Sequence, residues 1–101
     1  MADLIRVVVF REGDLWVAQC LEYDIGAQAA DLDTLRGRLT AVVSAELRES
    51  MNRHGEPFKG IPEAPYYFER LWSKHAGFLT QDGVAPGVPK PPVNIQYALC
   101  A

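Results

Sequence analysis

The stretch that decides the fold is residues 15–39, LWVAQCLEYDIGAQAADLDTLRGRL. It begins with a short apolar run, turns at Glu22–Asp24 and continues as a run of small side chains, Ile25–Ala30. Both runs have the length and the flanking turn residues that are typical of strands. An aspartate at position 31 or 33 is a preferred N-cap residue and complements the dipole of a helix that follows. The stretch therefore predicts two strands and then a helix.

The segment before this stretch predicts another strand, which forms a hairpin with it. Leu4–Arg11 is short and rich in β-branched residues, as strands are. Both of its faces are largely apolar, which indicates a central strand or a strand covered on both sides. Glu12-Gly13-Asp14 follows as a turn, because Gly13 can adopt a positive φ without steric cost. We expect Leu15–Leu21 to be the returning strand.

The helix is expected to be long and amphipathic and to end near Asn52, before Gly55. Its apolar residues recur at helical spacing and form one stripe: Leu35, Leu39, Val42, Val43, Leu47 and Met51. The charged residues are expected to lie mostly off this stripe: Arg36, Arg38, Glu46 and Glu49. Such a helix can cover one face of a sheet.

Residues 54–92 differ in composition, because they hold all seven prolines and five of the eight glycines of the chain. Within them, Ala64–His75 predicts a short helix, since Pro65 suits a first helical turn. Asp82–Pro92 is expected to be a proline-rich loop. Val93–Leu99 alternates apolar with polar residues and predicts the last strand.

The predicted elements follow the order β-β-β-α-(α)-β in a single domain of 101 residues, a length that suffices for one hydrophobic core. Residues 4–52 and 93–99 form the β-β-β-α-β core, and residues 54–92 are an insertion. We expect an α+β fold of two layers, in which one long helix covers an antiparallel-rich sheet.

Composition disfavours several classes of protein. The net charge is −3, with 10 basic and 13 acidic residues and no basic run, whereas nucleic-acid-binding proteins usually carry a basic stripe. No apolar run approaches the roughly 18 residues that span a bilayer. The start MADLIRVVVF lacks the features of a signal peptide, so we expect a cytoplasmic protein. Cys20 and Cys100 are interpreted as buried structural thiols.

Three features together resemble the bacterial HicB-like antitoxin family. They are the first hairpin, the run WVAQCLEYDI at Trp16–Ile25, and the step DTL at Asp33–Leu35 into an amphipathic helix. The resemblance covers about residues 4–50, and the closing strand at residues 93–99 fits the same fold. It implies a partly degraded ribonuclease H-like fold without nuclease activity. It also implies a small HicA-like toxin as partner, an mRNA-cleaving protein with a double-stranded-RNA-binding-like fold.

The sequence departs from the family pattern in three places. Leu32 stands where the family usually has glycine, and Arg36-Gly37-Arg38 replaces an acidic pair and an alanine. No helix-turn-helix or ribbon-helix-helix pattern follows the core. Repression of an operon through DNA contact, which many members perform, is therefore not expected.

Four acidic residues could in principle hold metal ions: Glu22, Asp24, Asp31 and Asp33. A ribonuclease H-type enzyme needs carboxylates that converge on two divalent ions, one of them from the middle of the first strand. That strand carries no acid, so we interpret the acidic residues as corner and helix caps. His54 and His75 lack ligand spacing, and no nucleophile or phosphate-binding glycine motif is present. We expect no catalytic residue, no metal and no cofactor.

Aromatic side chains are the main candidates for binding. The insertion gathers five of them near two cations: Tyr66, Tyr67, Phe68, Trp72 and Phe78, with Arg70 and Lys74. They could form a satellite core, anchor a protein partner or stack on bases. The second strand adds two aromatic residues that could face a partner or cover the sheet. The candidate partner-binding residues are Trp16, Tyr23, Tyr67, Phe68 and Trp72.

The leading hypothesis is a non-catalytic protein-interaction domain of HicB-like antitoxin type, which binds a HicA-like toxin or itself. A homo-oligomer is expected because strand edges need covering. One alternative is a small-molecule binding module with a cleft between Ile25–Ala30 and the aromatic insertion. A third is a divalent-metal nuclease.

Overall fold

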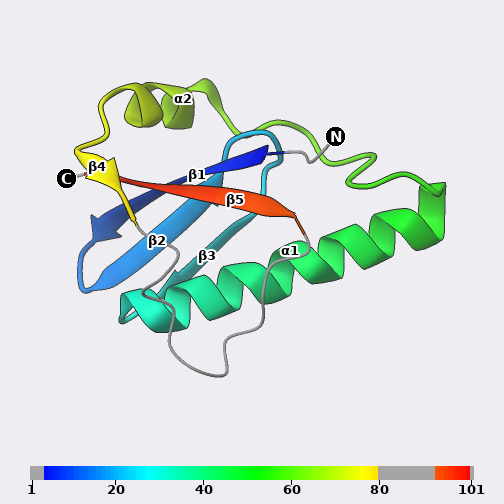
Figure 1. Cartoon of the computed structure of the whole chain (residues 1–101), viewed down its shortest axis with the longest axis horizontal. Coiled ribbons are helices and arrows are strands. Elements are labelled where there is room, and N and C mark those ends of the chain that lie inside the picture. The colour runs from blue at the N-terminus through cyan, green and yellow to red at the C-terminus, as the bar shows by residue number, and fades with distance from the viewer. Residues whose placement is uncertain (1–3, 80–92, 101) are drawn as a thin grey trace.

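The computed structural model describes residues 4–79 and 93–100 (Figure 1). Its elements in chain order are β1 (Leu4–Glu12), β2 (Leu15–Cys20), β3 (Gly26–Ala29), α1 (Leu32–His54), α2 (Tyr66–Ser73), β4 (Gly77–Phe78) and β5 (Asn94–Leu99). The strands form one sheet in the order β3-β2-β1-β5-β4. β1 and β5 are parallel, and the other neighbouring pairs are antiparallel. The predicted α+β class is confirmed. The predicted loop Asp82–Pro92 lies outside the described residues.

The predicted hairpin is present, with Gly13 at a φ of 63° in the turn. Val9 of β1 faces Ala18 of β2 in the register of this hairpin. β5 then pairs with the other side of β1, where Ile5 faces Ile95. The first strand of the chain therefore lies in the middle of the sheet, as its two apolar faces indicate.

Helices lie on both faces of the sheet, with α1 below it and α2 above it in Figure 1. Alternate residues of β1 serve the two faces, because successive side chains of a strand point to opposite sides. Ile5, Val7 and Val9 belong to the main core with Leu39 and Val43 of α1. Val8 belongs to a smaller cluster with Leu21 and Cys100, against which α2 packs. The second apolar face of β1 thus gives α2 a place to bind and adds a partial third layer to the expected two.

The two ends of α1 carry the signals that define helix termini. Asp31 is the N-cap, and its Oδ1 accepts a hydrogen bond from the Thr34 N–H at 2.8 Å. Gly55 ends the helix in the left-handed conformation at a φ of 72°, which glycine adopts without steric cost. The predicted end near Asn52 is therefore two residues short. The second half of α1 extends beyond the sheet (Figure 1), which explains why Met51 of the predicted stripe is 45% exposed.

Arg36 contradicts the expectation that it lies off the apolar stripe. It is buried to 8% exposure, and its guanidinium lies 5.3 Å from the centroid of the Tyr97 ring on β5. Arg36 follows the buried Leu35 in α1, and its side chain extends toward β5. Its charge is stabilised there by the face of the Tyr97 ring. The Arg36 Nε has no hydrogen-bond partner within residues 4–79 and 93–100.

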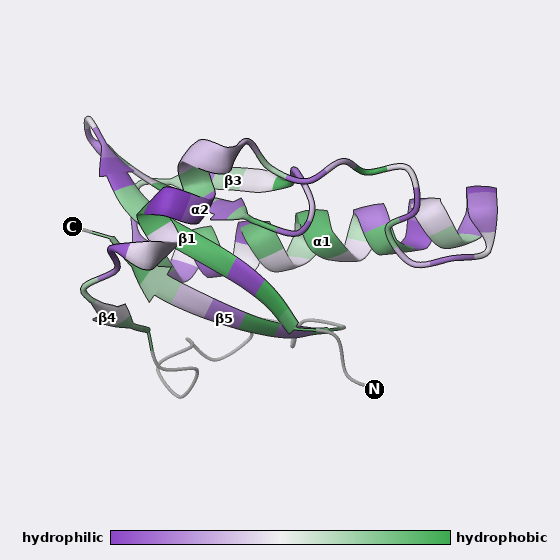
Figure 2. Ribbon diagram, turned by 90° about the horizontal axis from the view of Figure 1, so that it is seen from above, coloured by the Kyte–Doolittle hydropathy of each residue, from purple (hydrophilic) through white to green (hydrophobic). Residues whose placement is uncertain are grey.

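The segment between the two helices returns to the corner that joins β2 and β3. The Asp24 N–H donates to the Pro62 carbonyl at 2.7 Å, and the Ala64 N–H donates to the Leu21 carbonyl at 3.0 Å. Phe58 is buried at a φ of 59°, and its N–H donates to the Ser50 Oγ at 2.7 Å. Figure 2 shows the mostly hydrophobic ribbon of β1 and the mixture of hydrophobic and hydrophilic residues along α1.

Arg6 of β1 connects the sheet to α2. Its Nε donates to Glu22 Oε2 at 2.6 Å, and its Nη1 donates to Glu69 Oε1 of α2 at 2.7 Å. A second bond joins Nη2 to Glu69 Oε2 at 3.1 Å, and the guanidinium lies 5.5 Å from the centroid of the Trp72 ring. The hydrogen bonds to Glu69 and Glu22 raise the pKa of Arg6. One side chain therefore fixes α2 relative to β1 and the β2–β3 corner.

We predict that Arg6→Gln lowers the free energy of unfolding by about 1–3 kcal/mol, since it removes hydrogen bonds between charged groups. It also leaves the Glu22 and Glu69 carboxylates beside each other without a cation. Arg53→Gln is the matched control, because it removes an exposed helical ion pair with Glu49 at 2.6 Å, worth at most about 0.5 kcal/mol. Urea denaturation of both variants measures the difference. Equal losses in the two variants would contradict the role assigned to Arg6.

We predict that Asp31 makes stability depend on acidic pH. The hydrogen bonds that it accepts from the Thr34 N–H and hydroxyl lower the pKa of Asp31 in the folded protein. The stabilisation is present above the ordinary carboxyl pKa of about 4 and is lost as the pH falls through the lower folded value. Asp31→Asn is the control, because asparagine also caps a helix but does not titrate. Melting temperatures measured from pH 7 to pH 2 should show the wild type losing stability relative to this variant, and a constant difference would refute the assignment.

Candidate functional site

A groove of about 450 Å³ lies where α2 meets β1, β2 and the end of β5. Its lining is mostly aromatic and aliphatic: Phe10, Arg11, Trp16, Tyr67, Leu71, Leu99 and Cys100. Trp16 and Tyr67 are two of the candidate partner-binding residues, and the structure brings them together. The groove is therefore the feature that we take as the candidate site.

The aromatic residues of α2 divide into an exposed and a packed set. Tyr67 is 57% exposed and meets the ring of Phe68 edge-on, at 5.2 Å between centroids. Phe68 in turn packs against Phe10 of β1 at 6.2 Å. Phe68 and Trp72 are half-buried against the cluster around Val8. The satellite-core alternative therefore describes Phe68 and Trp72, whereas Tyr67 presents its ring at the groove.

Arg11 and Trp16 form the opposite part of the groove. They face each other across the β1–β2 ladder, and the Arg11 guanidinium lies 5.0 Å from the centroid of the Trp16 ring. Trp16 is half-buried and also packs against the main core. A cation held over an aromatic face keeps its charge available to a ligand while its stem covers apolar surface.

Tyr23 does not line this groove. Its ring stacks on Phe58 at 4.4 Å between centroids, and it packs against the main core between the sheet and α1. No local pattern in the sequence predicts this contact, because Phe58 reaches Tyr23 only after the chain turns back past the end of α1. The structure therefore separates Tyr23 from Trp16 and from the α2 aromatics.

The short strand β4 was not predicted. Gly77 and Phe78 pair with Leu99 and Ala98 of β5, and the Ala76 N–H donates to the Leu99 carbonyl at 2.8 Å. The Phe78 ring lies 4.3 Å from the His75 ring between centroids. β4 therefore attaches the end of α2 to the sheet beside the groove.

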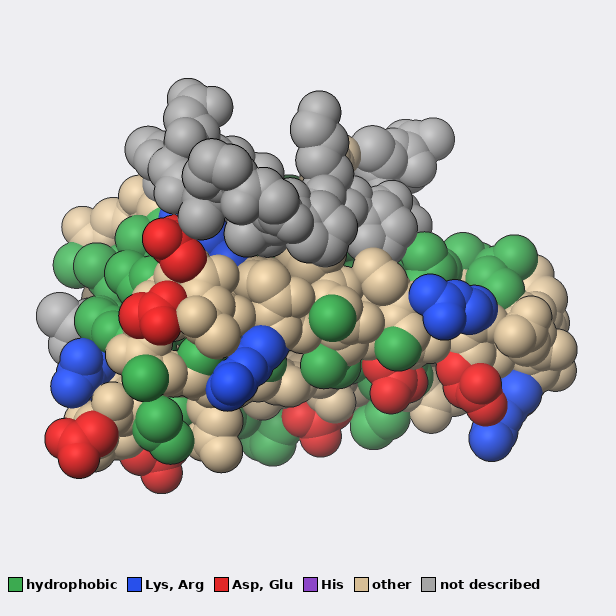
Figure 3. Space-filling view, turned by 90° about the horizontal axis from the view of Figure 1, so that it is seen from below, with side chains coloured by type: hydrophobic (Ala, Val, Ile, Leu, Met, Phe, Trp, Pro, Cys, Tyr) green, Lys and Arg blue, Asp and Glu red, His purple; other side chains and the backbone are tan. Residues whose placement is uncertain are grey.

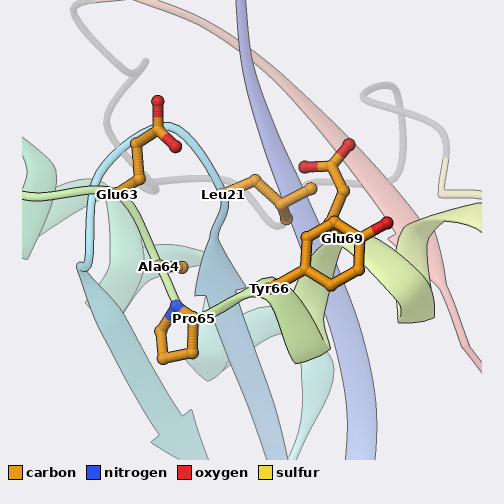
Figure 4. A pocket seen from close by; sticks show the side chains of 6 residues that line it. All are labelled: Leu21, Glu63, Ala64, Pro65, Tyr66 and Glu69. Atoms are coloured by element: carbon orange, nitrogen blue, oxygen red, sulfur yellow. The ribbon is translucent and has the colours of Figure 1, made fainter.

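A second, smaller pocket of about 200 Å³ lies at the start of α2. Figure 4 shows the Glu63 and Glu69 side chains on either side of Leu21. Glu69 is held by two hydrogen bonds from Arg6, so its carboxylate has a structural role. Tyr66 lines this pocket and is 75% exposed.

Three of the four acidic residues considered as metal ligands have other contacts. Glu22 is paired with Arg6, Asp24 Oδ1 accepts from Gln19 Nε2 at 3.0 Å, and Asp31 caps α1. Among the residues that the structure describes, no group of three or more His, Cys, Asp or Glu side chains could hold a metal ion. The capping interpretation of Asp31 is confirmed.

The small-molecule alternative requires a cleft between Ile25–Ala30 and the aromatic insertion, and the structure places these two segments in different surroundings. β3 lies at the edge of the sheet, and Ala29 packs into the core against α1. α2 lies on the opposite face, because the residues of β1 that it contacts alternate with those that face α1. Ala29 therefore faces α1, and no residue of β3 is among the described residues that line the two pockets beside α2.

Both cysteines are buried thiols without a disulfide partner, as interpreted from the sequence. Burial raises the pKa of Cys20 to about 12, with a smaller contribution from the charge of Glu22. Burial also raises the pKa of Cys100, whose Sγ lies 3.4 Å from the Leu71 carbonyl that accepts its hydrogen bond. The thiol at the groove is therefore protonated at neutral pH and a poor nucleophile.

No protein family model, curated protein or solved structure matches the chain. No helix in residues 4–79 and 93–100 has the length and hydropathy to cross a membrane.

We predict that Cys20 reacts at least about 1,000-fold more slowly with a thiol reagent at pH 8 in the native protein than after unfolding. A pKa of about 12 leaves roughly one thiol in ten thousand ionised at that pH, against about a quarter for an ordinary cysteine. Ser73→Cys provides an exposed thiol on α2 as the control. Mass spectrometry of timed samples identifies the labelled residue. Labelling of Cys20 as fast as the control would refute its burial.

Proposed function

We propose that the chain is a non-catalytic protein-interaction domain of antitoxin type, which binds a folded toxin-like protein through the groove beside α2. The β-β-β-α-β order of the core supports this proposal, because it is the order that the HicB-like resemblance implies. The observation that carries the proposal is the composition of the groove, whose described lining combines three aromatic residues, Phe10, Trp16 and Tyr67, with the cation of Arg11.

Trp16, Tyr67 and Arg11 are the residue types that supply most of the binding energy at protein interfaces. Their amphipathic side chains bury much apolar area and also offer a hydrogen bond or a charge. Leu71 and Leu99 provide the apolar floor against which such anchors pack. A protein partner that inserts an apolar side chain here would exclude water from the centre of the contact.

The groove offers little to a chemical reaction. The described residues that line it include no carboxylate or histidine, so they offer no pair of groups for general acid–base catalysis. Its cysteine is protonated at neutral pH because burial raises the pKa of Cys100. Binding without turnover is therefore the function that these residues support best.

The charges of the chain favour a basic partner. The net charge of −3 attracts a cationic protein at long range, and Arg11 can pair with an acidic residue at the contact itself. The two unpaired thiols suit a reducing compartment, so we place the interaction in the cytoplasm.

A small-molecule binding module is the second candidate, since a groove of about 450 Å³ has the size of a small-molecule site, about 300–1,000 Å³. Tyr67, which lines the groove, is 57% exposed, and such an exposed ring favours a protein partner over a small molecule. Saturable binding of an apolar carboxylate at Arg11, with no binding of a neighbouring gene's product, would replace the first proposal with this one.

We predict that Tyr67→Ser weakens binding of the partner at least about tenfold, or about 1.4 kcal/mol. The partner to test is a small basic protein with a double-stranded-RNA-binding-like pattern encoded beside this chain, co-expressed and titrated by calorimetry. Tyr66→Ser is the matched control, because Tyr66 is exposed one residue earlier but does not line the groove. It should change the Kd less than about twofold, since residues outside the contact contribute little.

Two outcomes would overturn the proposal. The first is that the neighbouring protein neither co-purifies with the chain nor loses its toxicity in the presence of the chain. The second is RNA cleavage in magnesium or manganese that disappears in Asp24→Asn, which would indicate a nuclease in place of a binding domain.

A further inference from the structure

β3 forms one edge of the sheet and turns part of its backbone outward. The Cys20 N–H donates to the Ile25 carbonyl at 2.9 Å, and Ala27 faces Ala18 in the register with β2. Because an antiparallel ladder alternates, Ile25, Ala27 and Ala29 direct their polar backbone groups to β2. The backbone groups of Gly26 and Gln28 therefore point away from the sheet, where no strand of the described residues meets them.

The residues of β3 themselves lack the features that usually prevent pairing with another strand. Charged residues, prolines and bulges protect the edges of natural sheets, but β3 has the sequence GAQA. One side chain reaches the edge, since Arg38 Nη1 of α1 donates to the Gln28 carbonyl at 2.8 Å. A carbonyl oxygen has two lone pairs, so this contact leaves Gln28 able to accept a second hydrogen bond in the plane of the sheet.

We propose that β3 pairs antiparallel with β3 of a second copy of this chain, around a twofold axis at Ala27, so that the two sheets become continuous. In this register Gly26 faces Gln28 of the second copy. The glycine leaves room for the glutamine side chain, so the two long side chains do not collide. The strand is thus complementary to itself, as a twofold interface requires.

The flank of α1 beside β3 is also complementary to itself. Arg38, Val42, Ala45 and Glu49 recur at helical spacing on this flank, and Arg38 and Glu49 lie three turns apart. The twofold axis makes the two α1 helices antiparallel, so that Arg38 approaches the Glu49 end of the second copy and Val42 approaches Ala45. Val42 is 36% exposed, and Figure 3 shows hydrophobic side chains set between charged ones along this helix.

This charge arrangement selects a second copy over an unrelated strand. Glu49 forms an exposed ion pair with Arg53 at 2.6 Å, and its carboxylate can accept from a second cation. An arbitrary partner strand would satisfy the backbone of Gly26 and Gln28 but would bring no helix to match Arg38 and Glu49. The contact involves β3 and α1, whereas the proposed partner groove involves α2, so either can fail without the other.

The test compares the mass in solution of the wild type and of two variants, each with a charge on a different flank of α1. Light scattering after size exclusion at about 100 µM, a concentration at which even a modest interface associates, should give twice the chain mass of 11.2 kDa. Val42→Glu should raise the dimer dissociation constant at least about tenfold by burying a charge in the contact. Met51→Glu is the matched control, because Met51 is exposed on the other flank of α1, and it should leave the constant unchanged. Circular dichroism verifies that both variants fold.

A cysteine at the axis tests the register directly. Ala27 and its counterpart would form a non-hydrogen-bonded pair with Cα atoms about 4.5 Å apart, which a disulfide can bridge. Ala27→Cys should therefore form a covalent dimer under mild oxidation, and the exposed Lys59→Cys should not. A single-chain mass at the same concentration, or a dimer that neither responds to Val42→Glu nor crosslinks through Ala27→Cys, would overturn the proposal. If Ala27→Cys does not fold, the comparison of the Val42→Glu and Met51→Glu variants still tests whether the dimer forms through this interface.

Discussion

The Arg6 guanidinium, held between Glu22 and Glu69, is the interaction on which the placement of α2 depends. α2 has eight residues and none of them is fully buried, and a helix of this length has little stability of its own. The groove has no second wall without α2, since Tyr67 and Leu71 come from this helix. The partly buried ion pairs of Arg6 thus determine the shape of the groove, although Arg6 itself is not among the residues that line it.

The sequence predicted those parts of the fold that depend on local pattern. The β1–β2 hairpin follows from Gly13 and the flanking apolar runs, and α1 follows from its N-cap aspartate and its helical spacing. The parallel pairing of β1 with β5 and the two-residue strand β4 have no local signal, because partners distant in sequence decide them. Arg36 was misplaced for a similar reason, since burial of its charge depends on the Tyr97 ring of β5.

The candidate site was predicted in part. Trp16 and Tyr67 were identified by residue type, and both line the groove. The sequence does not predict Arg11 and Leu99 as groove residues, because they come together only when β1, β2 and β5 lie side by side. The sequence predicts Tyr23 as a second aromatic residue that could face a partner, but in the structure its ring stacks on Phe58. Residue type identifies what can bind, and only the topology decides which of these residues share a surface.

The parallel pairing of β1 with β5 has a consequence for biosynthesis. Leu4 pairs with Asn94, so one side of the central strand stays open until almost the whole described chain has been made. At about 5–20 residues per second, translation leaves that backbone exposed for several seconds after the β1–β2 hairpin has emerged. During this interval a hydrophobic strand with an unpaired edge is a substrate for chaperones and a starting point for aggregation. The yield of this protein in a cell should therefore depend on how quickly its last strand follows the first.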